Sequence, residues 1–210
     1  MLARSTRIKI CGITRYEDAT AAAAAGADAI GFVFYRNSPR FVDPDRAKAI
    51  AVAIPPFVST VGLFVDADAA DVEASLRTFR VDYLQFHGDE NREYCSQFGV
   101  PFLKAVRVRP GLDLLHYAAD FSAARALLLD AFVDGVPGGT GQRFDWNLIP
   151  RNLPVPIVLS GGLSPDNITE AVRKVRPWAV DVSSGVEAAK GIKDGDKIKQ
   201  FIRGVRNADV

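Results

Sequence analysis

Residues 8–25 read Ile-Lys-Ile-Cys-Gly-Ile-Thr-Arg-Tyr-Glu-Asp-Ala-Thr-Ala-Ala-Ala-Ala-Ala, and this stretch holds the unit from which the fold is predicted. An apolar, strand-like run ends at Cys11, Gly12 follows at once, and an alanine-rich helical pattern begins at Tyr16. Enzymes built on parallel sheets place their chemistry at the carboxyl ends of such strands. The stretch therefore predicts a strand followed by a helix. Cys11 lies at the end of this strand, where its thiol either packs in the core or takes part in the chemistry.

The same alternation recurs along the whole chain. Strand-like runs lie at Ile8–Cys11, Ala29–Phe34, Val58–Val65, Tyr83–Phe86, Phe102–Val106, Ala126–Leu129, Ile157–Leu159 and Ala179–Val182. Helical patterns lie at Tyr16–Ala25, Pro44–Val52, Ala67–Phe79, Glu90–Phe98, Leu112–Ala119, Pro165–Val175 and Asp194–Arg206, with a short helix at Asp145–Ile149. Strands alternating with helices predict a parallel sheet with helical crossovers. Eight such units favour a single (β/α)8 TIM barrel, one domain over residues 1–210, and an open doubly wound sheet is the alternative.

Residues at the expected helix ends support this division. Asp43-Pro44 and Ser164-Pro165 each place an N-cap residue before a proline at the first helical position. Gly26 follows the alanine run, where glycine commonly ends a helix. We therefore expect helices to begin at Pro44 and Pro165.

Composition narrows the classes of function. The chain has 48% hydrophobic and 24% charged residues, a net charge of +1 and two cysteines. Near-zero charge predicts no general attraction to nucleic acid or a membrane, and no apolar run approaches the roughly 18 residues of a membrane helix. Few cysteines and a basic N-terminus without an apolar signal segment favour a reducing compartment, so we expect a cytoplasmic protein. Two histidines without zinc-type spacing predict no metal site, and nucleotide-binding glycine motifs are absent.

Two groups stand out at the strand ends as candidates for proton transfer. Alternation along the first strand puts Cys11 and Lys9 on one face, toward the barrel interior, and the isoleucines toward the helices. Asp130 follows three leucines, and partial desolvation would suit its carboxyl group to donate a proton. The alternatives are a buried packing role for Cys11, and a solvated loop position or a helix N-cap for Asp130.

Other strand ends carry candidate binding groups. Ser160-Gly161-Gly162 and Ser183-Ser184-Gly185 follow the last two strands, where glycine-rich loops of barrels often bind phosphate. A tight turn is the other explanation for the glycines. Arg40 either holds a carboxylate through two parallel hydrogen bonds or lies on the surface. His87 is either a proton shuttle or a hydrogen-bonded structural residue.

A set of motifs, taken together and in order, resembles phosphoribosylanthranilate isomerase of tryptophan biosynthesis. The resemblance covers nearly the whole chain and rests on 9–14 (KICGIT), 31–34 (GFVF) with 38–40 (SPR), 61–65 (VGLFV), 84–88 (LQFHG), 128–130 (LLD), 138–141 (GGTG) with 144–146 (FDW), 159–163 (LSGGL) and 180–187 (VDVSSGVE). No motif that carries chemistry departs from the pattern.

The resemblance implies an Amadori rearrangement without cofactor or metal. By the family's pattern Asp130 is the general acid and Cys11 the general base, and Arg40 binds the anthranilate carboxylate. The substrate-binding set implied around the phosphate is Gly161, Gly162, Asp181, Ser183, Ser184 and Gly185. The partner is a small phosphorylated substrate, and both a monomer and a homodimer are open. Two alternatives are the histidine-pathway isomerase, which uses two aspartates, and a non-catalytic phosphate-binding barrel.

Overall fold

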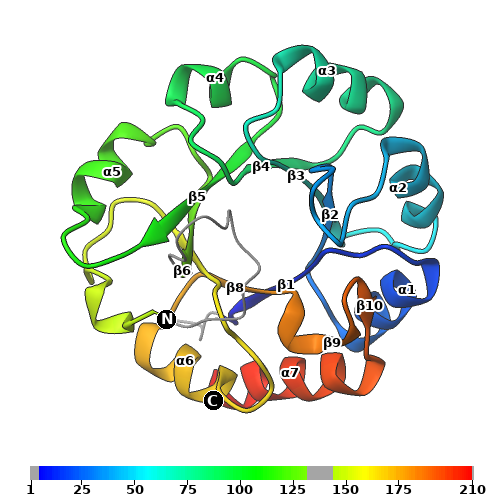
Figure 1. Cartoon of the computed structure of the whole chain (residues 1–210). Coiled ribbons are helices and arrows are strands. Elements are labelled where there is room, and N and C mark those ends of the chain that lie inside the picture. The colour runs from blue at the N-terminus through cyan, green and yellow to red at the C-terminus, as the bar shows by residue number, and fades with distance from the viewer. Residues whose placement is uncertain (1–4, 132–143, 210) are drawn as a thin grey trace.

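The computed structural model describes residues 5–131 and 144–209, and these form a ring of parallel strands surrounded by helices (Figure 1). The barrel strands are β1 (Arg7–Cys11), β2 (Ala29–Val33), β3 (Ser59–Phe64), β4 (Tyr83–Phe86), β5 (Phe102–Val108), β6 (Ala126–Ala131), β7 (Ile157–Leu159) and β8 (Ala179–Val182). The helices are α1 (Tyr16–Ala25), α2 (Pro44–Ala51), α3 (Ala69–Thr78), α4 (Arg92–Ser96), α5 (Leu114–Asp120), α6 (Ile168–Val175) and α7 (Gly195–Ala208). Two short 3-10 helices, η1 (Trp146–Leu148) and η2 (Ser184–Val186), and a hairpin of β9 (Glu187–Ala189) and β10 (Ile192–Lys193) complete the described elements.

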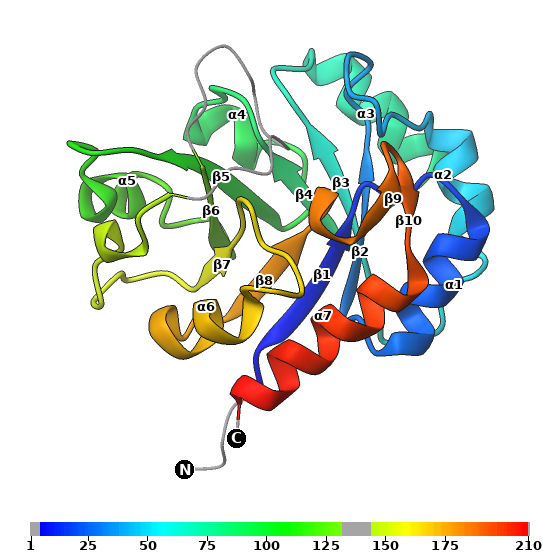
Figure 2. The ribbon, with the colours of Figure 1, turned by 60° about the horizontal axis from the view of Figure 1, so that its bottom comes forward.

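The sheet closes on itself, which confirms the (β/α)8 barrel and excludes the open sheet. Strand β1 pairs in parallel with β2 on one side and with β8 on the other, where Lys9 lies opposite Asp181. Figure 2 shows α7 lying along the outside of this closure, between α1 and α6. Since both neighbours of β1 are barrel strands, the described sheet has no open edge at which pairing could continue.

Side-chain alternation along β1 separates the core from the site. Ile8 and Ile10 point outward into the main core and pack with helix residues such as Ile198 and Phe201. Full burial of one such side chain contributes about 1.5–3 kcal/mol. Lys9 and Cys11 point into the barrel, as alternation predicts.

The helix-start predictions have different outcomes. Helix α2 begins at Pro44, and the Asp43 carboxylate accepts a hydrogen bond from the Arg46 amide at 2.7 Å, as predicted. Helix α1 ends at Gly26, whose φ of 99° is left-handed. The prediction for Pro165 was wrong, because α6 begins three residues later, at Ile168.

A turn before α6 explains the later start. The Asn167 side-chain oxygen accepts from the Ser164 amide at 3.0 Å, and its nitrogen donates to the Gly162 carbonyl at 2.8 Å. These bonds satisfy the backbone in a turn rather than in a helix. They also tie the start of α6 to the loop after β7.

The hairpin of β9 and β10 was not predicted. Its sequence, Glu-Ala-Ala-Lys-Gly-Ile-Lys over 187–193, lacks the apolar alternation of a strand. Tertiary contacts hold it instead, because the Lys193 amide donates to Asp18 of α1 at 3.0 Å and the Arg40 Nε donates to Glu187 at 2.7 Å. Within the described part of the chain, no helix is long and apolar enough to cross a membrane.

The two aspartates at the N-caps of α2 and α3 allow a matched stability test. Asp43 caps its helix with a side-chain hydrogen bond, whereas the Asp68 side chain makes no such bond. Asp43→Ala should therefore lower the free energy of unfolding by about 1 kcal/mol, and Asp68→Ala by less than about 0.5 kcal/mol. Urea denaturation of both variants measures this, and equal losses would contradict the assigned cap.

Candidate functional site

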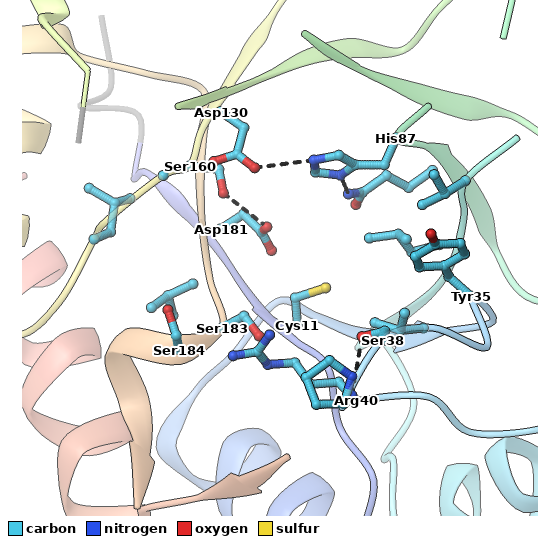
Figure 3. A pocket seen from close by; sticks show the side chains of 18 of the residues that line it. Cys11, Tyr35, Ser38, Arg40, His87, Asp130, Ser160, Asp181, Ser183 and Ser184 are labelled. Atoms are coloured by element: carbon cyan, nitrogen blue, oxygen red, sulfur yellow. Dashed lines mark hydrogen bonds and ion pairs between the residues drawn. The ribbon is translucent and has the colours of Figure 1, made fainter. Parts of the chain in front are cut away.

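A pocket of about 330 Å³ opens at the carboxyl ends of the barrel strands. Most of the predicted site residues line it, namely Cys11, Arg40, Asp130, Gly161, Gly162, Asp181, Ser183 and Ser184. Figure 3 shows the labelled side chains among them, those of Cys11, Arg40, Asp130, Asp181, Ser183 and Ser184, around the same space. The fold thus brings together side chains up to 173 positions apart in the chain, from position 11 to position 184.

Gly185 is the exception among the predicted binding residues. It is missing from the described residues that line the pocket, and a Cβ added to it would lie 1.9 Å from the Leu163 carbonyl oxygen. Its lack of a side chain lets η2 pack against the loop after β7. The loop at 138–141 lies outside the described residues.

Cys11 ends β1 with its thiol in the pocket and only 4% of its surface exposed. Burial raises the pKa of the Cys11 thiol, and the Lys9 ammonium offsets part of this rise because it favours the thiolate. Gly31 of β2 makes room for the sulfur, since a Cβ there would lie 2.8 Å from the Cys11 Sγ. Cys95, by contrast, is fully buried in the core.

Lys9 is the charged group next to Cys11 inside the barrel. Its Nζ donates to the Asp181 Oδ1 at 2.8 Å and to the Gln85 Oε1 at 2.9 Å. Burial alone lowers the pKa of Lys9, but the Asp181 carboxylate and the Cys11 thiol raise it above its ordinary value. Lys9 is therefore held as an ammonium.

Asp130 lies within β6, which runs on to Ala131, and not in the loop that was the alternative. Its Oδ1 accepts from the Ala131 amide at 2.8 Å, and its Oδ2 lies 3.1 Å from the His87 Nε2. Gly161 approaches closely, because a Cβ there would lie 2.8 Å from the Asp130 Oδ1. With a φ of 79°, Gly161 also needs the left-handed backbone that glycine adopts freely.

Arg40 is buried at the pocket edge, which excludes the surface position considered for it. Its Nε and Nη2 donate to the two Glu187 oxygens at 2.7 and 2.8 Å. The Lys193 Nζ donates to Glu187 at 3.0 Å and to the Ser183 carbonyl at 3.0 Å. Burial acts to raise the pKa of Glu187, but Arg40 and Lys193 bring it below its ordinary value. Arg40 is thus tied to the loop after β8.

Three residues of this site were not singled out from the sequence: Gln85, Glu187 and Lys193. Gln85 has a detectable signal, because it is a polar residue inside an apolar strand and its neighbours Leu84 and Phe86 face the core. Glu187 ends the 180–187 motif, but its partners could not be assigned from the sequence, and Lys193 has no signal, since it lies in the hairpin whose pattern is not strand-like. Among residues 5–131 and 144–209, no cluster of three His, Cys, Asp or Glu side chains could hold a metal.

A closed (β/α)8 barrel with acidic, thiol and cationic side chains around one pocket at its carboxyl end defines this protein as a TIM-barrel enzyme. The model of the family described as N-(5'phosphoribosyl)anthranilate (PRA) isomerase matches residues 8–204. The chain belongs to this family.

Individual relatives are similar in sequence to this chain over nearly its full length. The isomerase of that name from Thiobacillus denitrificans is 63% identical over 94% of this chain and 97% of its own, and that from Nitrosospira multiformis is 58% identical over 96% and 97%. The crystal structure of phosphoribosyl anthranilate isomerase from Thermotoga maritima matches with a TM-score of 0.87 and 41% identity, covering 96% of this chain and 99% of that one. Another solved phosphoribosyl anthranilate isomerase, in complex with reduced 1-(o-carboxyphenylamino)-1-deoxyribulose 5-phosphate, matches with a TM-score of 0.82 and 40% identity over 96% and 99%.

The raised pKa of Cys11 predicts how its thiol reacts. Only the thiolate is nucleophilic, so iodoacetamide should modify Cys11 slowly at pH 7, with a rate that rises about tenfold per pH unit beyond pH 8.5. Cys95, buried and with its pKa raised to about 12, should stay unmodified in the folded protein. Mass spectrometry of the wild type and of Cys95→Ala measures this. A rate that is already constant above pH 7 would contradict the assignment.

Proposed function

We propose that this chain converts N-(5-phosphoribosyl)anthranilate to 1-(o-carboxyphenylamino)-1-deoxyribulose 5-phosphate in tryptophan biosynthesis, with Asp130 as general acid and Cys11 as general base. One observation carries the proposal: in a chain of this family, Cys11, Asp130 and Arg40 line a single pocket. The reaction moves hydrogen within one molecule, oxidising C2′ and reducing C1′. It therefore needs two proton-transfer groups and orientation, and no external oxidant.

Asp130 acts first in the proposed sequence. It donates a proton to the ribose ring oxygen, the bond from C1′ to that oxygen breaks, and the anthranilate nitrogen lone pair forms a C1′–N double bond. The Asp130 Oδ1 accepts a hydrogen bond from the Ala131 amide, and the Oδ2 lies 3.1 Å from the His87 Nε2, so both neighbours can stabilise the carboxylate that remains.

Cys11 acts in the second step. Its thiolate removes the proton from C2′, and the electron pair of that C–H bond forms the enolamine, which tautomerises to the ketone. A raised pKa reduces the share of thiolate but makes each thiolate a stronger base, and Lys9 limits the loss. Burial therefore raises the pKa of Cys11, and the Lys9 ammonium acts to lower it.

Substrate binding is assigned to two parts of the rim. The bonds to Glu187 leave the Arg40 Nη1 and one Nη2 hydrogen free of that partner, and this edge suits the anthranilate carboxylate. The phosphate fits the loops after β7 and β8, where Gly161 and Gly162 have φ values of 79° and 63°. We assign Asp181, Ser183, Ser184 and Gly185 to the same binding region, Gly185 through packing.

Cys11 favours this function over the histidine-pathway isomerase, whose acid and base are two aspartates. The proposal also includes a single domain over residues 1–210, a small phosphorylated substrate as partner, no nucleic-acid or membrane partner, and location in the cytoplasm. Whether the chain is a monomer or a homodimer stays open. The isomerase of Thermotoga maritima is described as dimeric.

Removal of either proton-transfer group should strongly reduce turnover without unfolding the barrel. In Cys11→Ala and Asp130→Asn we expect kcat to fall about 10²–10⁴-fold, because general acid and base catalysis each contribute that much. The fluorescence loss of phosphoribosylanthranilate measures turnover, and circular dichroism checks folding. Cys95→Ala is the matched control and should keep wild-type kcat.

Other outcomes of this assay decide between the alternatives. A wild type that isomerises the aminoimidazole ribotide of histidine synthesis, but not phosphoribosylanthranilate, would reject the assignment. A wild type that binds inorganic phosphate but turns over neither compound would favour the non-catalytic barrel.

Arg40→Lys tests the carboxylate site. Lysine keeps the charge but loses the planar, two-bond geometry, so KM should rise about tenfold, equivalent to one charged hydrogen bond of about 1.5 kcal/mol. Arg36→Lys is the control, because Arg36 is exposed in the same loop. Equal KM values for wild type and Arg40→Lys would contradict the assigned role.

A further inference from the structure

A chain of hydrogen bonds crosses the barrel interior from Lys9 to Asp130. Lys9 of β1 contacts Gln85 of β4, Gln85 contacts His87, and His87 contacts Asp130 of β6, over distances of 2.9, 3.0 and 3.1 Å. All four residues are buried, with exposed fractions of 4%, 0%, 7% and 6% in the same order. Buried polar groups of this kind are costly unless every donor meets an acceptor, so the direction of each bond is constrained.

Lys9 sets the direction at one end. An ammonium has donors and no acceptor, so the Gln85 atom that faces it must be the carbonyl oxygen. The Gln85 amide nitrogen then faces the His87 Nδ1, at 3.0 Å. The opposite orientation of the Gln85 amide would place its nitrogen, a donor, against the Lys9 ammonium, which is also a donor. Asp181 contacts the same ammonium at 2.8 Å.

The orientation of the Gln85 amide decides which nitrogen of the His87 imidazole carries the proton. An amide nitrogen only donates, so the His87 Nδ1 must accept and carries no proton. In a neutral imidazole the proton is then on Nε2, which faces the Asp130 Oδ2 at 3.1 Å. An imidazolium would set its Nδ1–H against the amide hydrogens of Gln85.

The charged groups around the imidazole agree with this state. Asp130 is the titratable group in direct contact with His87, and its Oδ2, 3.1 Å from Nε2, can accept the Nε2–H of this tautomer. Lys9 reaches His87 only through Gln85, and Asp181 balances its charge. Cys11 lies elsewhere on the pocket wall.

We propose that Gln85 is a positioning residue that holds His87 as the neutral Nε2–H tautomer, so that His87 donates to Asp130 and does not shuttle protons. The lone pair of Nδ1 is occupied by Gln85, and Nε2 carries the only ring proton, so His87 has no basic nitrogen free for the substrate. The tautomer itself stands on geometry alone. Its benefit for catalysis, a fixed donor for the Asp130 carboxylate after proton transfer, rests on the proposed function.

Nuclear magnetic resonance can read the tautomer directly. The chain has two histidines, so a long-range ¹H–¹⁵N spectrum of histidine-labelled protein contains two imidazole patterns. At pH 7, His87 should show a protonated Nε2 and an unprotonated Nδ1. His116, with an exposed side chain, serves as the internal reference, and His116→Gln assigns the signals.

Substitution of Gln85 by glutamate is the sharpest variant. The new carboxylate accepts where the amide donated, so the His87 Nδ1 should gain a proton, and an imidazolium should persist to higher pH than in the wild type. We expect kcat to fall at least about tenfold with little change in KM, since the Asp130 partner changes and the substrate contacts do not. Gln85→Met, which removes the amide without adding charge, should give a mixture of tautomers.

A pair of histidine variants separates donation from packing. His87→Gln places an amide donor near the position of Nε2 and should retain more kcat than His87→Leu, which fills the space without a donor. Thermal unfolding of both reports stability, so a difference in kcat at equal melting temperature points to the hydrogen bond.

The results that overturn the inference are distinct from those that reject the isomerase. An Nδ1–H tautomer or an imidazolium in the wild type at pH 7 overturns it, and so does an unchanged His87 pattern in Gln85→Glu. The wild-type spectrum decides even if the Gln85 variants do not fold. The expected tautomer in a protein without isomerase turnover supports the hydrogen-bond chain and counts against the proposed function alone.

Discussion

The buried ion pair between Lys9 and Asp181 is the interaction on which the rest of the site depends. The two residues lie opposite each other on β1 and β8, where the barrel closes. Loss of one partner would leave an uncompensated buried charge, at a cost of about 3–5 kcal/mol. Because Asp181 keeps Lys9 charged, the ammonium can favour the Cys11 thiolate and orient Gln85. The same pair thus joins the ends of the sheet and sets the electrostatics of the pocket.

A second charged chain organises the outer rim. Arg40, from the segment after β2, is held by Glu187, and Glu187 is held by Lys193, which also contacts the Ser183 carbonyl. The proposed carboxylate and phosphate subsites are therefore connected through the β9–β10 hairpin. Side chains that are held in place before the substrate arrives cost less to order during the reaction. The two chains together hold the proposed acid, the proposed base and the two proposed anion sites around one pocket.

Particular elements show how far the sequence could lead. The eight strands, the closed barrel and the inward direction of Cys11 follow from apolar runs and alternation, and the structure confirms them. The start of α6 could not be predicted, because Asn167 bonds to the Ser164 amide and the Gly162 carbonyl and so favours a turn over the proline-led helix. The hairpin at 187–193 was missed because contacts with Asp18 and Arg40 hold it, and these residues lie far away in the sequence.

By itself the sequence determined the fold class and which strand ends carry a thiol, a carboxylate and glycine-rich loops, since burial periodicity and residue chemistry are local properties. Tertiary structure alone decided the partners: that Asp130 lies within a strand beside His87, that Arg40 is buried against Glu187, and that Lys9 reaches Asp181 and Gln85. The physical reason is that pKa shifts and hydrogen-bond direction depend on burial and on atoms within about 3–4 Å. In this barrel those atoms come from strands that are far apart in the chain.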